Sequence, residues 1–327
     1  MAATPIDSIG IDGVDPVDRA QLPWRRFASQ FAESKLAMFG LAMVLVIVAI
    51  ALFAPWLAPQ NPYDLTKLDL LDSRQPPGAQ SMDGMTYWLG TDGQGRDMLS
   101  AIFYGLRVSL MVGVVSGVIA LTIGSILGVL AAYAGGRFEQ IVMRVVDIQL
   151  GFPAILVALI LLAVLGKGVD KIIIALVTVQ WAYYARTARS AALVERNKEY
   201  IEAARSLGLS GARIVLRHLL PNALPPLIVV GTVQVAHAIA LEATLSFLGL
   251  GLQFPEVSLG VMANGGRDSF FSLPRLAIIP GVVITLIVLA VNFLASWLRV
   301  VFDPQEREKR FAAGATTAAT TVEGAAT

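Results

Sequence analysis

The stretch VSLMVGVVSGVIALTIGSILGVLAAYAGG, residues 108–136, contains 29 consecutive uncharged residues. An α-helix rises about 1.5 Å per residue, so about 18 to 20 apolar residues are enough to cross the roughly 30 Å hydrocarbon core of a bilayer. The stretch therefore predicts a membrane-spanning helix with residues to spare. We accordingly expect an all-α membrane protein.

Five further uncharged runs bring the predicted number of transmembrane helices to six. Four of them are 19 to 23 residues long, one with a single histidine. The fifth, residues 172–185, has 14 residues, a length that fits a buried helix as well as a span. We interpret it as a span because Lys171 and Arg186 flank it and their long side chains can reach the interface. The four longer runs are residues 36–54, 148–166, 219–241 and 276–298.

The bulk composition excludes several classes of protein and site. Hydrophobic residues make up 56% of the chain and charged residues 15%, and the mean hydropathy is +0.68, far from the balance of soluble domains. Cysteine is absent, which excludes a disulfide framework and a thiolate metal site. The two histidines, His218 and His237, are too few for a multi-histidine metal site. A net charge of +1 argues against a nucleic-acid partner.

The basic residues predict the orientation of the chain. If both termini lie in the cytoplasm, 17 of the 25 Lys and Arg residues fall on that side. Cytoplasmic segments of membrane proteins carry such an excess, and an even number of spans agrees with this N-in, C-in topology.

The topology divides the chain into five segments. Trp24, Phe27 and Phe31 recur at three- and four-residue steps beside basic residues, which predicts an interfacial helix, with a plain solvated lead-in as the alternative. The predicted segments are a disordered cytoplasmic N-terminus (1–21), the interfacial helix with the first span (22–57), an external loop (58–105), a core of five spans (106–303) with a cytoplasmic loop at 187–222, and a disordered cytoplasmic tail (304–327).

Four glycines in the second span predict a tight helix contact. Gly113, Gly117, Gly124 and Gly128 fall within about 60° of one another on a helix that turns about 100° per residue. Small residues along one face let a neighbouring helix approach closely. We interpret this stripe as a packing surface and not as a ligand site.

Residues 186–217 form the only long polar interruption in the second half of the chain. Within it, residues 194–207 lack Gly and Pro and predict a helix that places Tyr200, Ala203, Ala204 and Leu207 on one side. Small side chains there would let a partner's groove close around the backbone. An ordinary solvated helical hairpin is the alternative.

The ends of this polar stretch carry helix-terminating residues. Gly208 fits a helix C-terminus, where a positive φ costs glycine little, and Ser210 is placed to cap the next helix. Pro221, Pro225 and Pro226 mark the return to the membrane, where we do not expect a straight helix to continue.

The sequence resembles a known family at this loop and at three other stretches. Glu202-Ala203-Ala204, followed by Gly208 and Leu220-Pro221, resembles the signature loop of ABC-importer permeases. One departure is His218, which stands where the broad signature has an aliphatic residue, although the peptide branch tolerates histidine. The other stretches resemble C-type permease subunits of dipeptide, oligopeptide and nickel ABC importers: WLGTDGQGRD (88–97) leading into YGLRVSL (104–110), HLLPN (218–222), and EATLSFLGLG (242–251).

The resemblance implies the type I ABC-importer permease architecture in a bacterial cytoplasmic (inner) membrane. It implies a non-catalytic subunit without a cofactor of its own, and the chain agrees in lacking a G-x-x-x-x-G-K-[ST] phosphate loop. The implied partners are a homologous second permease, two ATPase subunits or domains that bind ATP and Mg, an external binding protein and membrane lipid. The residues implied to couple to the ATPase are Glu202, Ala203, Ala204, Gly208, Leu220 and Pro221.

The substrate is less constrained than the architecture. Di- and oligopeptides are the first expectation, with nickel complexes, glutathione, haem or oligosaccharides as alternatives. A secondary transporter driven by an ion gradient would favour more charges within the membrane, and a membrane anchor would not need a docking loop.

Glu242 interrupts the apolar character of the fifth span. Ionisable groups at membrane depth are costly and usually face a bundle interior or a water-filled cavity. The carboxylate could line the pathway and meet a peptide's amino terminus, or it could hydrogen-bond at a helix interface. We favour the second interpretation, because the run around Glu242 resembles the family as a whole, whereas the substrates vary.

Overall fold

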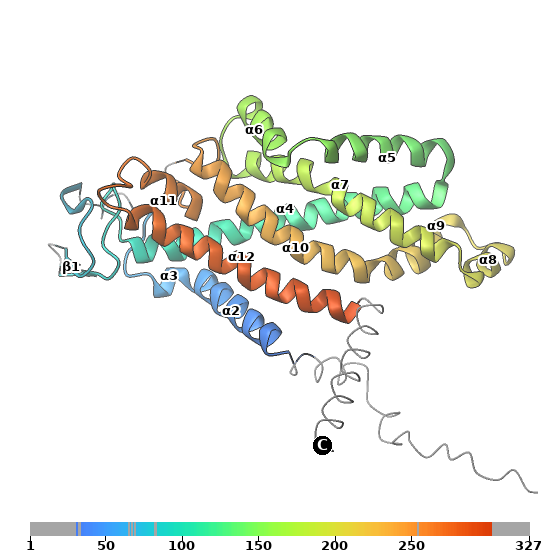
Figure 1. Ribbon diagram of the computed structural model, residues 1–327, viewed down its shortest axis with the longest axis horizontal. Coiled ribbons are helices and arrows are strands. Elements are labelled where there is room, and N and C mark those ends of the chain that lie inside the picture. Colours follow the sequence, from blue (N-terminus) through green and yellow to red (C-terminus); the bar gives the residue numbers. More distant parts are fainter. Residues whose placement is uncertain are drawn as a thin grey trace, which may run out of the picture.

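The structure, a computed structural model, describes residue 31 and residues 34–302, apart from 65, 67, 69, 82, 83 and 254. The predictions for segments 1–21 and 304–327, and nearly all of the predicted interfacial helix, lie outside the described residues. Long helices lie side by side along the longest axis of the molecule (Figure 1). They are α2 (Lys35–Leu52), α4 (Met98–Ala134), α7 (Val169–Arg196), α10 (Leu220–Phe247) and α12 (Arg275–Phe302).

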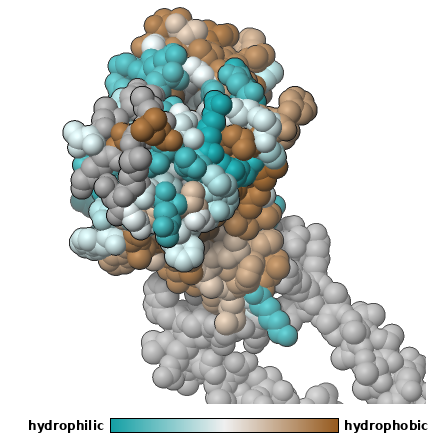
Figure 2. All heavy atoms as spheres, turned by 90° about the vertical axis from the view of Figure 1, so that its left-hand side faces the viewer, coloured by the Kyte–Doolittle hydropathy of each residue, from teal (hydrophilic) through white to brown (hydrophobic). Residues whose placement is uncertain are grey.

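Shorter elements occupy the two ends of this bundle. One end, called here the hairpin end, has the antiparallel strands β1 (Ala79–Gln80) and β2 (Thr86–Tyr87), in which Ala79 pairs with Tyr87. The expectation of an all-α protein is therefore corrected to a mostly helical one. Figure 2 looks onto the hairpin end and shows hydrophilic residues gathered there. This end also holds α3 (Ala54–Leu57), the 3₁₀ turn η3 (Leu70–Asp72) and α11 (Leu259–Gly265).

The opposite end, called here the α8 end, holds α8 (Glu199–Ser206), α9 (Gly211–Ile214) and the π turn η4 (Val215–Leu219) (Figure 1). In η4 the backbone N–H of Leu220 donates to the carbonyl of Val215, five residues back. The predicted polar loop and the predicted external loop thus lie at opposite ends of the long axis.

Among the described residues, four helical stretches are long and apolar enough to cross a membrane. They are Lys35–Leu52, Met98–Ala134, Gly211–Phe247 and Arg275–Arg299, and a bent pair of helices brings the number to as many as five. The prediction of a membrane protein with several spanning helices is confirmed at this level.

The bent pair replaces a helix that we predicted to be continuous. Residues 148–166 are divided between α5 (Gly136–Gly151) and α6 (Ala154–Leu165), whose axes meet at 93°. Pro153 has no N–H to donate and disfavours helical dihedrals in the residue before it. Phe152 accordingly adopts an extended conformation, with φ −96° and ψ 143°.

The predicted short span 172–185 lies inside α7, which has 28 residues but is not among the apolar candidates. Its length of about 42 Å would suffice to cross a bilayer. α7 packs against α4, α10, α5 and α6, and its Gln180 and Tyr184 are buried. A helix covered by its neighbours does not need an apolar surface on every side, which explains why the uncharged run understated its length.

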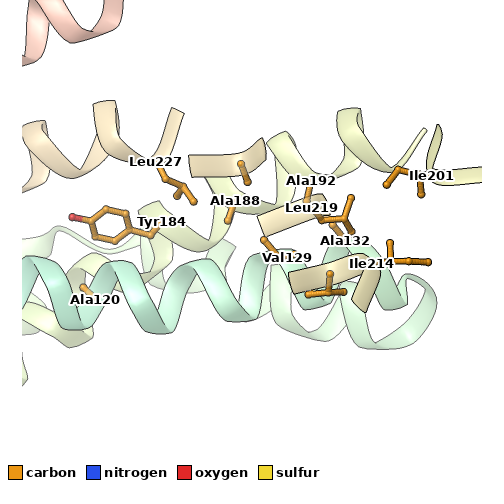
Figure 3. Packing of buried hydrophobic residues seen from close by; sticks show 12 residues of the cluster. Ala120, Val129, Ala132, Tyr184, Ala188, Ala192, Ile201, Ile214, Leu219 and Leu227 are labelled. Atoms are coloured by element: carbon orange, nitrogen blue, oxygen red, sulfur yellow. The ribbon is translucent and has the colours of Figure 1, made fainter. Parts of the chain in front are cut away.

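The contact between α4 and α7 forms the centre of the bundle. Figure 3 shows Val129 and Ala132 of α4 near Ala188 and Ala192 of α7, with Leu219 beside them. Small alanines in this cluster allow close approach of the two helices. The same cluster continues to the α8 end through Ile201 and Ile214.

The four glycines of α4 face two different helices. A Cβ atom on Gly113 or Gly117 would meet side chains of α10, at 2.6 Å from Ile239 Cγ1 and 3.2 Å from Val235 Cγ2 respectively. A Cβ atom on Gly124 would lie 2.6 Å from Tyr184 Cβ of α7, and one on Gly128 would lie 2.8 Å from Ala188 Cβ. The stripe thus divides between an α10 half and an α7 half.

Candidate functional site

The α8 end carries the residues of the predicted loop, and a short non-helical segment separates α8 from α7. Instead of one helix over 194–207, α7 ends at Arg196 and α8 starts at Glu199, with Lys198 in an extended conformation. Lys198 Nζ lies 2.6 Å from Glu195 Oε2, and the Tyr200 hydroxyl donates to Glu195 Oε1. These contacts hold α8 back against the end of α7.

The two faces of α8 differ in exposure. Ile201 and Ala204 are buried, and Ile201 belongs to the central cluster of Figure 3. Glu202 and Ala203 are exposed, and the Leu207 side chain that follows the helix is 81% exposed. We expected Ala203 and Ala204 to lie together on a side of the helix open to a partner. This is wrong for Ala204, which is buried.

Gly208 ends α8 through a defined backbone motif. Its φ is +73°, a value that L side chains rarely adopt. The N–H of Gly208 donates to the carbonyl of Arg205 (2.9 Å), and the N–H of Leu209 donates to that of Ala204 (3.1 Å). This pair of bonds is the Schellman motif, which stops a helix and turns the chain sharply. The glycine therefore fixes how α8 leads into the following segment.

The first residues of α10 follow this turn in the sequence, after α9 and η4. Leu220 is half-buried and packs on the central cluster, and Pro221 is exposed. We did not expect a straight helix to continue at these prolines, yet α10 runs through Pro225 and Pro226 as one helix. Pro221 lies in the first turn of α10, where proline is tolerated because the N–H there needs no partner, and the widened turn η4 ends two residues before it. Pro225 and Pro226 lie inside the helix.

Ser210 precedes α9 as predicted, but its side chain makes no capping hydrogen bond. Its carbonyl oxygen instead accepts from the N–H of Ile214 at 3.1 Å. The prediction of the position is correct, and the predicted role of the hydroxyl is not.

One contact that the sequence did not predict joins α8 to α10. Asn222 Nδ2 donates to the Tyr200 hydroxyl (3.1 Å) and to the His218 carbonyl (2.8 Å). The rings of Tyr200 and His218 are 5.8 Å apart. The spacing of His218 and Asn222, four residues apart in HLLPN, could have suggested the local bond, but nothing local indicated Tyr200.

Glu242 lies far from this end, buried where α10 meets α4 and α11. Its side chain is 0% exposed and accepts hydrogen bonds from Ser109 Oγ (3.0 Å) and Ser246 Oγ (2.8 Å). This arrangement satisfies a carboxyl group inside the bundle and favours the structural interpretation over the pathway one.

No group of three or more His, Cys, Asp or Glu side chains that could hold a metal ion occurs among residues with described positions. The polar residues at the α8 end form hydrogen bonds and ion pairs between helices. Beside them, Glu202, Ala203 and Leu207 leave an exposed face on α8 and its C-terminal turn.

Two family models match this chain. Residues 120–308 match the binding-protein-dependent transport system inner membrane component, and residues 23–77 match the N-terminal TM domain of oligopeptide transport permease C. The first match alone covers more than half of the chain. The chain belongs to this permease family.

Several relatives match the permease over most of their length. The di/tripeptide transport system permease protein DppC of Pseudomonas aeruginosa is 38% identical over 86% of this chain and 92% of its own. The oligopeptide transport system permease protein OppC of Bacillus subtilis is 35% identical over 87% and 90%. The glutathione transport system permease protein GsiD of Escherichia coli is 36% identical over 88% and 92%.

Membership of the family defines the general role of the permease. It is a multi-pass inner-membrane component of an ABC importer, and it works with an ATPase and a binding protein. It is the non-catalytic component of that system, for which no cofactor site is expected.

Proposed function

We propose that this permease forms, with a homologous second permease, the pathway through which di- and oligopeptides enter the cell. Two ATPase subunits or domains drive the cycle, and an external binding protein delivers the substrate. The proposal for the substrate rests on relatives named as peptide transport permeases, which are 35–40% identical over four fifths or more of the chain. Glutathione, itself a tripeptide, is the second candidate because GsiD is similar to the same extent.

The coupling surface is the exposed face of α8, with Glu202, Ala203 and Gly208. The observation that carries this assignment is the combination of a buried inner face, an exposed outer face and a Schellman stop at one end of the molecule. A small side chain at residue 203 lets a groove of the ATPase close around the helix, and the apolar Leu207 side chain can be buried there. Burial of about 100 Å² of apolar surface contributes about 2.5 kcal/mol to such a contact.

The permease crosses the membrane six times with both termini in the cytoplasm. The four apolar stretches, the bent α5–α6 pair and α7 are the six spans. The length of α7 and its cover of neighbouring helices support including it. Lipid surrounds the exposed apolar side chains of α2 and α4, such as Leu45 and Val118.

Single cysteines test this topology without background, since the chain has none of its own. Cysteines introduced at Ser210 and Thr317 are expected to react with a membrane-impermeant maleimide only after the cells are permeabilised. A cysteine at Gln80, exposed in β1, is expected to react in intact cells. Labelling of Ser210 or Thr317 in intact cells would contradict the topology. Thr317 lies outside the described residues.

Growth assays test the substrate. A strain that lacks this permease and is auxotrophic for leucine is expected to lose growth on leucine-containing di- and tripeptides, and to grow normally on free leucine. Re-expression of the permease is the control. Normal peptide growth combined with lost use of glutathione as a sulfur source would transfer the assignment to glutathione.

A further inference from the structure

Three side chains at the α8 end form a continuous chain of hydrogen bonds, called here the Tyr200 clasp. Glu195 belongs to α7, Tyr200 to α8 and Asn222 to α10. The Tyr200 hydroxyl donates to Glu195 Oε1 and accepts from Asn222 Nδ2 at 3.1 Å. Lys198 Nζ, 2.6 Å from Glu195 Oε2, holds the other oxygen of the carboxylate. One hydroxyl group thus connects three helices.

The protonation state of Tyr200 decides which groups donate and which accept in the hydrogen bonds of the clasp. Partial burial, together with the hydrogen bond to the neighbouring Glu195 carboxylate, raises the pKa of Tyr200 to about 12. The hydroxyl therefore stays protonated throughout the physiological pH range and donates a hydrogen bond to Glu195. Its oxygen lone pairs remain available to the Asn222 amide.

The clasp attaches to α10 next to a weak point of the helix. In η4 the hydrogen bond from Leu220 reaches five residues back, and Pro221 has no N–H to contribute. π turns and prolines are the usual sites at which helices bend. Asn222 Nδ2 also bonds the His218 carbonyl within η4, at 2.8 Å, so the same side chain supports the π turn and holds α8.

Apolar packing alone would connect α8 and α10 less specifically. Ile201 of α8, Ile214 of α9 and Leu219 of η4 belong to one buried cluster. Apolar contacts are non-directional, so they constrain the orientation of α8 against its neighbours less tightly than hydrogen bonds do. Hydrogen bonds have narrow preferences in distance and angle, and they fix the relative position of the helices.

We propose that the Tyr200 clasp makes α8 and α10 move as one body, so that a displacement of α8 by the ATPase tilts α10 at η4. Tyr200 and Asn222 are positioning residues in this device. The proposal rests on the proposed docking of α8 to the ATPase. His218 borders the clasp, since its main-chain carbonyl is bonded by Asn222 and its ring lies beside that of Tyr200.

The test uses the complete transporter in proteoliposomes. Its variants are Tyr200→Phe, which keeps the ring, and Asn222→Leu, which keeps the side-chain shape and removes the amide. Stimulation of ATP hydrolysis by the binding protein, loaded from a mixture of di- and tripeptides, is expected to fall roughly five- to tenfold, the change that loss of one hydrogen bond produces. Co-purification of the ATPase with the permease is expected to stay at the wild-type level.

Asn292→Leu is the matched control. Asn292 Nδ2 bonds the carbonyl four residues back at 2.8 Å, as Asn222 does, but on α12. In Asn292→Leu, stimulation of ATP hydrolysis by the binding protein is expected to equal that of wild type. Asn222→Gln, which keeps an amide, is expected to retain part of the coupling that Asn222→Leu loses. The double variant of Tyr200 and Asn222 is expected to be no worse than the more affected single variant.

The outcomes separate the clasp from the docking of α8. Ala203→Asp changes the exposed face of α8 and tests the docking. If Asn222→Leu and Tyr200→Phe keep wild-type stimulation while Ala203→Asp loses it, the clasp is overturned and the docking proposal stays intact. Wild-type behaviour of Ala203→Asp overturns the docking proposal and the clasp with it. Equal loss in Asn292→Leu shows a general effect of removing the amide and also overturns the clasp. If Asn222→Leu does not fold, Tyr200→Phe decides, because its ring is retained.

Discussion

Ala203→Asp is expected to uncouple this permease from its ATPase while leaving the permease folded and inserted. Ala203 is exposed on α8, so a carboxylate there meets water in the free subunit and costs little. In the docked state the same carboxylate would lose its hydration against the ATPase groove without a designated partner. We expect at least a 100-fold loss of ATPase affinity, about 2.7 kcal/mol, measured by co-purification and by titration of the ATPase into permease-containing nanodiscs.

A second change tests the angle of α8 rather than its surface. At Gly208 an added Cβ would meet no atom within 4 Å, so the cost of Gly208→Val comes from the φ of +73°. That cost is about 1–2 kcal/mol and is higher for a β-branched residue. We expect α8 to be re-aimed and transport lost with normal insertion. Gly208→Asn is expected to be milder, because asparagine tolerates a positive φ.

Glu199→Gln, on the first turn of α8, is the control for both changes. Glu199 is exposed and close in sequence to the proposed coupling residues but not one of them. Its transport is expected to be near that of wild type. Full transport by Gly208→Val with the ATPase still bound would contradict the proposed role of this turn.

Features carried by local sequence were predictable, and features that depend on distant contacts were not. The uncharged run 108–136 identified the span within α4, and Gly208 identified the end of α8. The break between α5 and α6 was also encoded locally, by Pro153, but a count of charges does not register proline. The link between Tyr200 and Asn222 joins residues 22 positions apart and exists only once the helices have packed.

α7 shows the limit of hydropathy as a guide to membrane helices. Its uncharged run ends at Ala185, yet the helix continues to Arg196. Arg186 and Arg189 are paired with Asp147 (2.5 Å) and Glu139 (2.5 Å) of α5. Because the charges are matched by a neighbouring helix, the sequence of α7 alone could not show where its helix ends.

Gly124→Ala is expected to destabilise the permease strongly, although it adds a single methyl group. The new Cβ would lie 2.6 Å from Tyr184 Cβ and 2.9 Å from the backbone nitrogen of Ala185, and under 3.0 Å from the backbone oxygen of Trp181. Backbone atoms cannot move aside as a side chain does, so α4 and α7 must separate along the centre of the bundle. Overpacking of this kind costs about 1–3 kcal/mol, and we expect the upper end of that range.

Other glycines provide graded comparisons for this prediction, measured as the midpoint of thermal unfolding in detergent. Gly117→Ala is expected to be milder than Gly124→Ala, because its nearest neighbour is the movable Val235 Cγ2 at 3.2 Å. Gly105, also on α4 but outside the stripe, is not a neutral control, since a Cβ there would lie 3.2 Å from the backbone nitrogen of Leu259. Gly281, on α12, has no atom within 4 Å of an added Cβ, so Gly281→Ala is expected to be neutral or to stabilise by about 0.5–1 kcal/mol. Equal midpoints for Gly124→Ala and Gly281→Ala would show that the close approach of α4 and α7 does not limit stability.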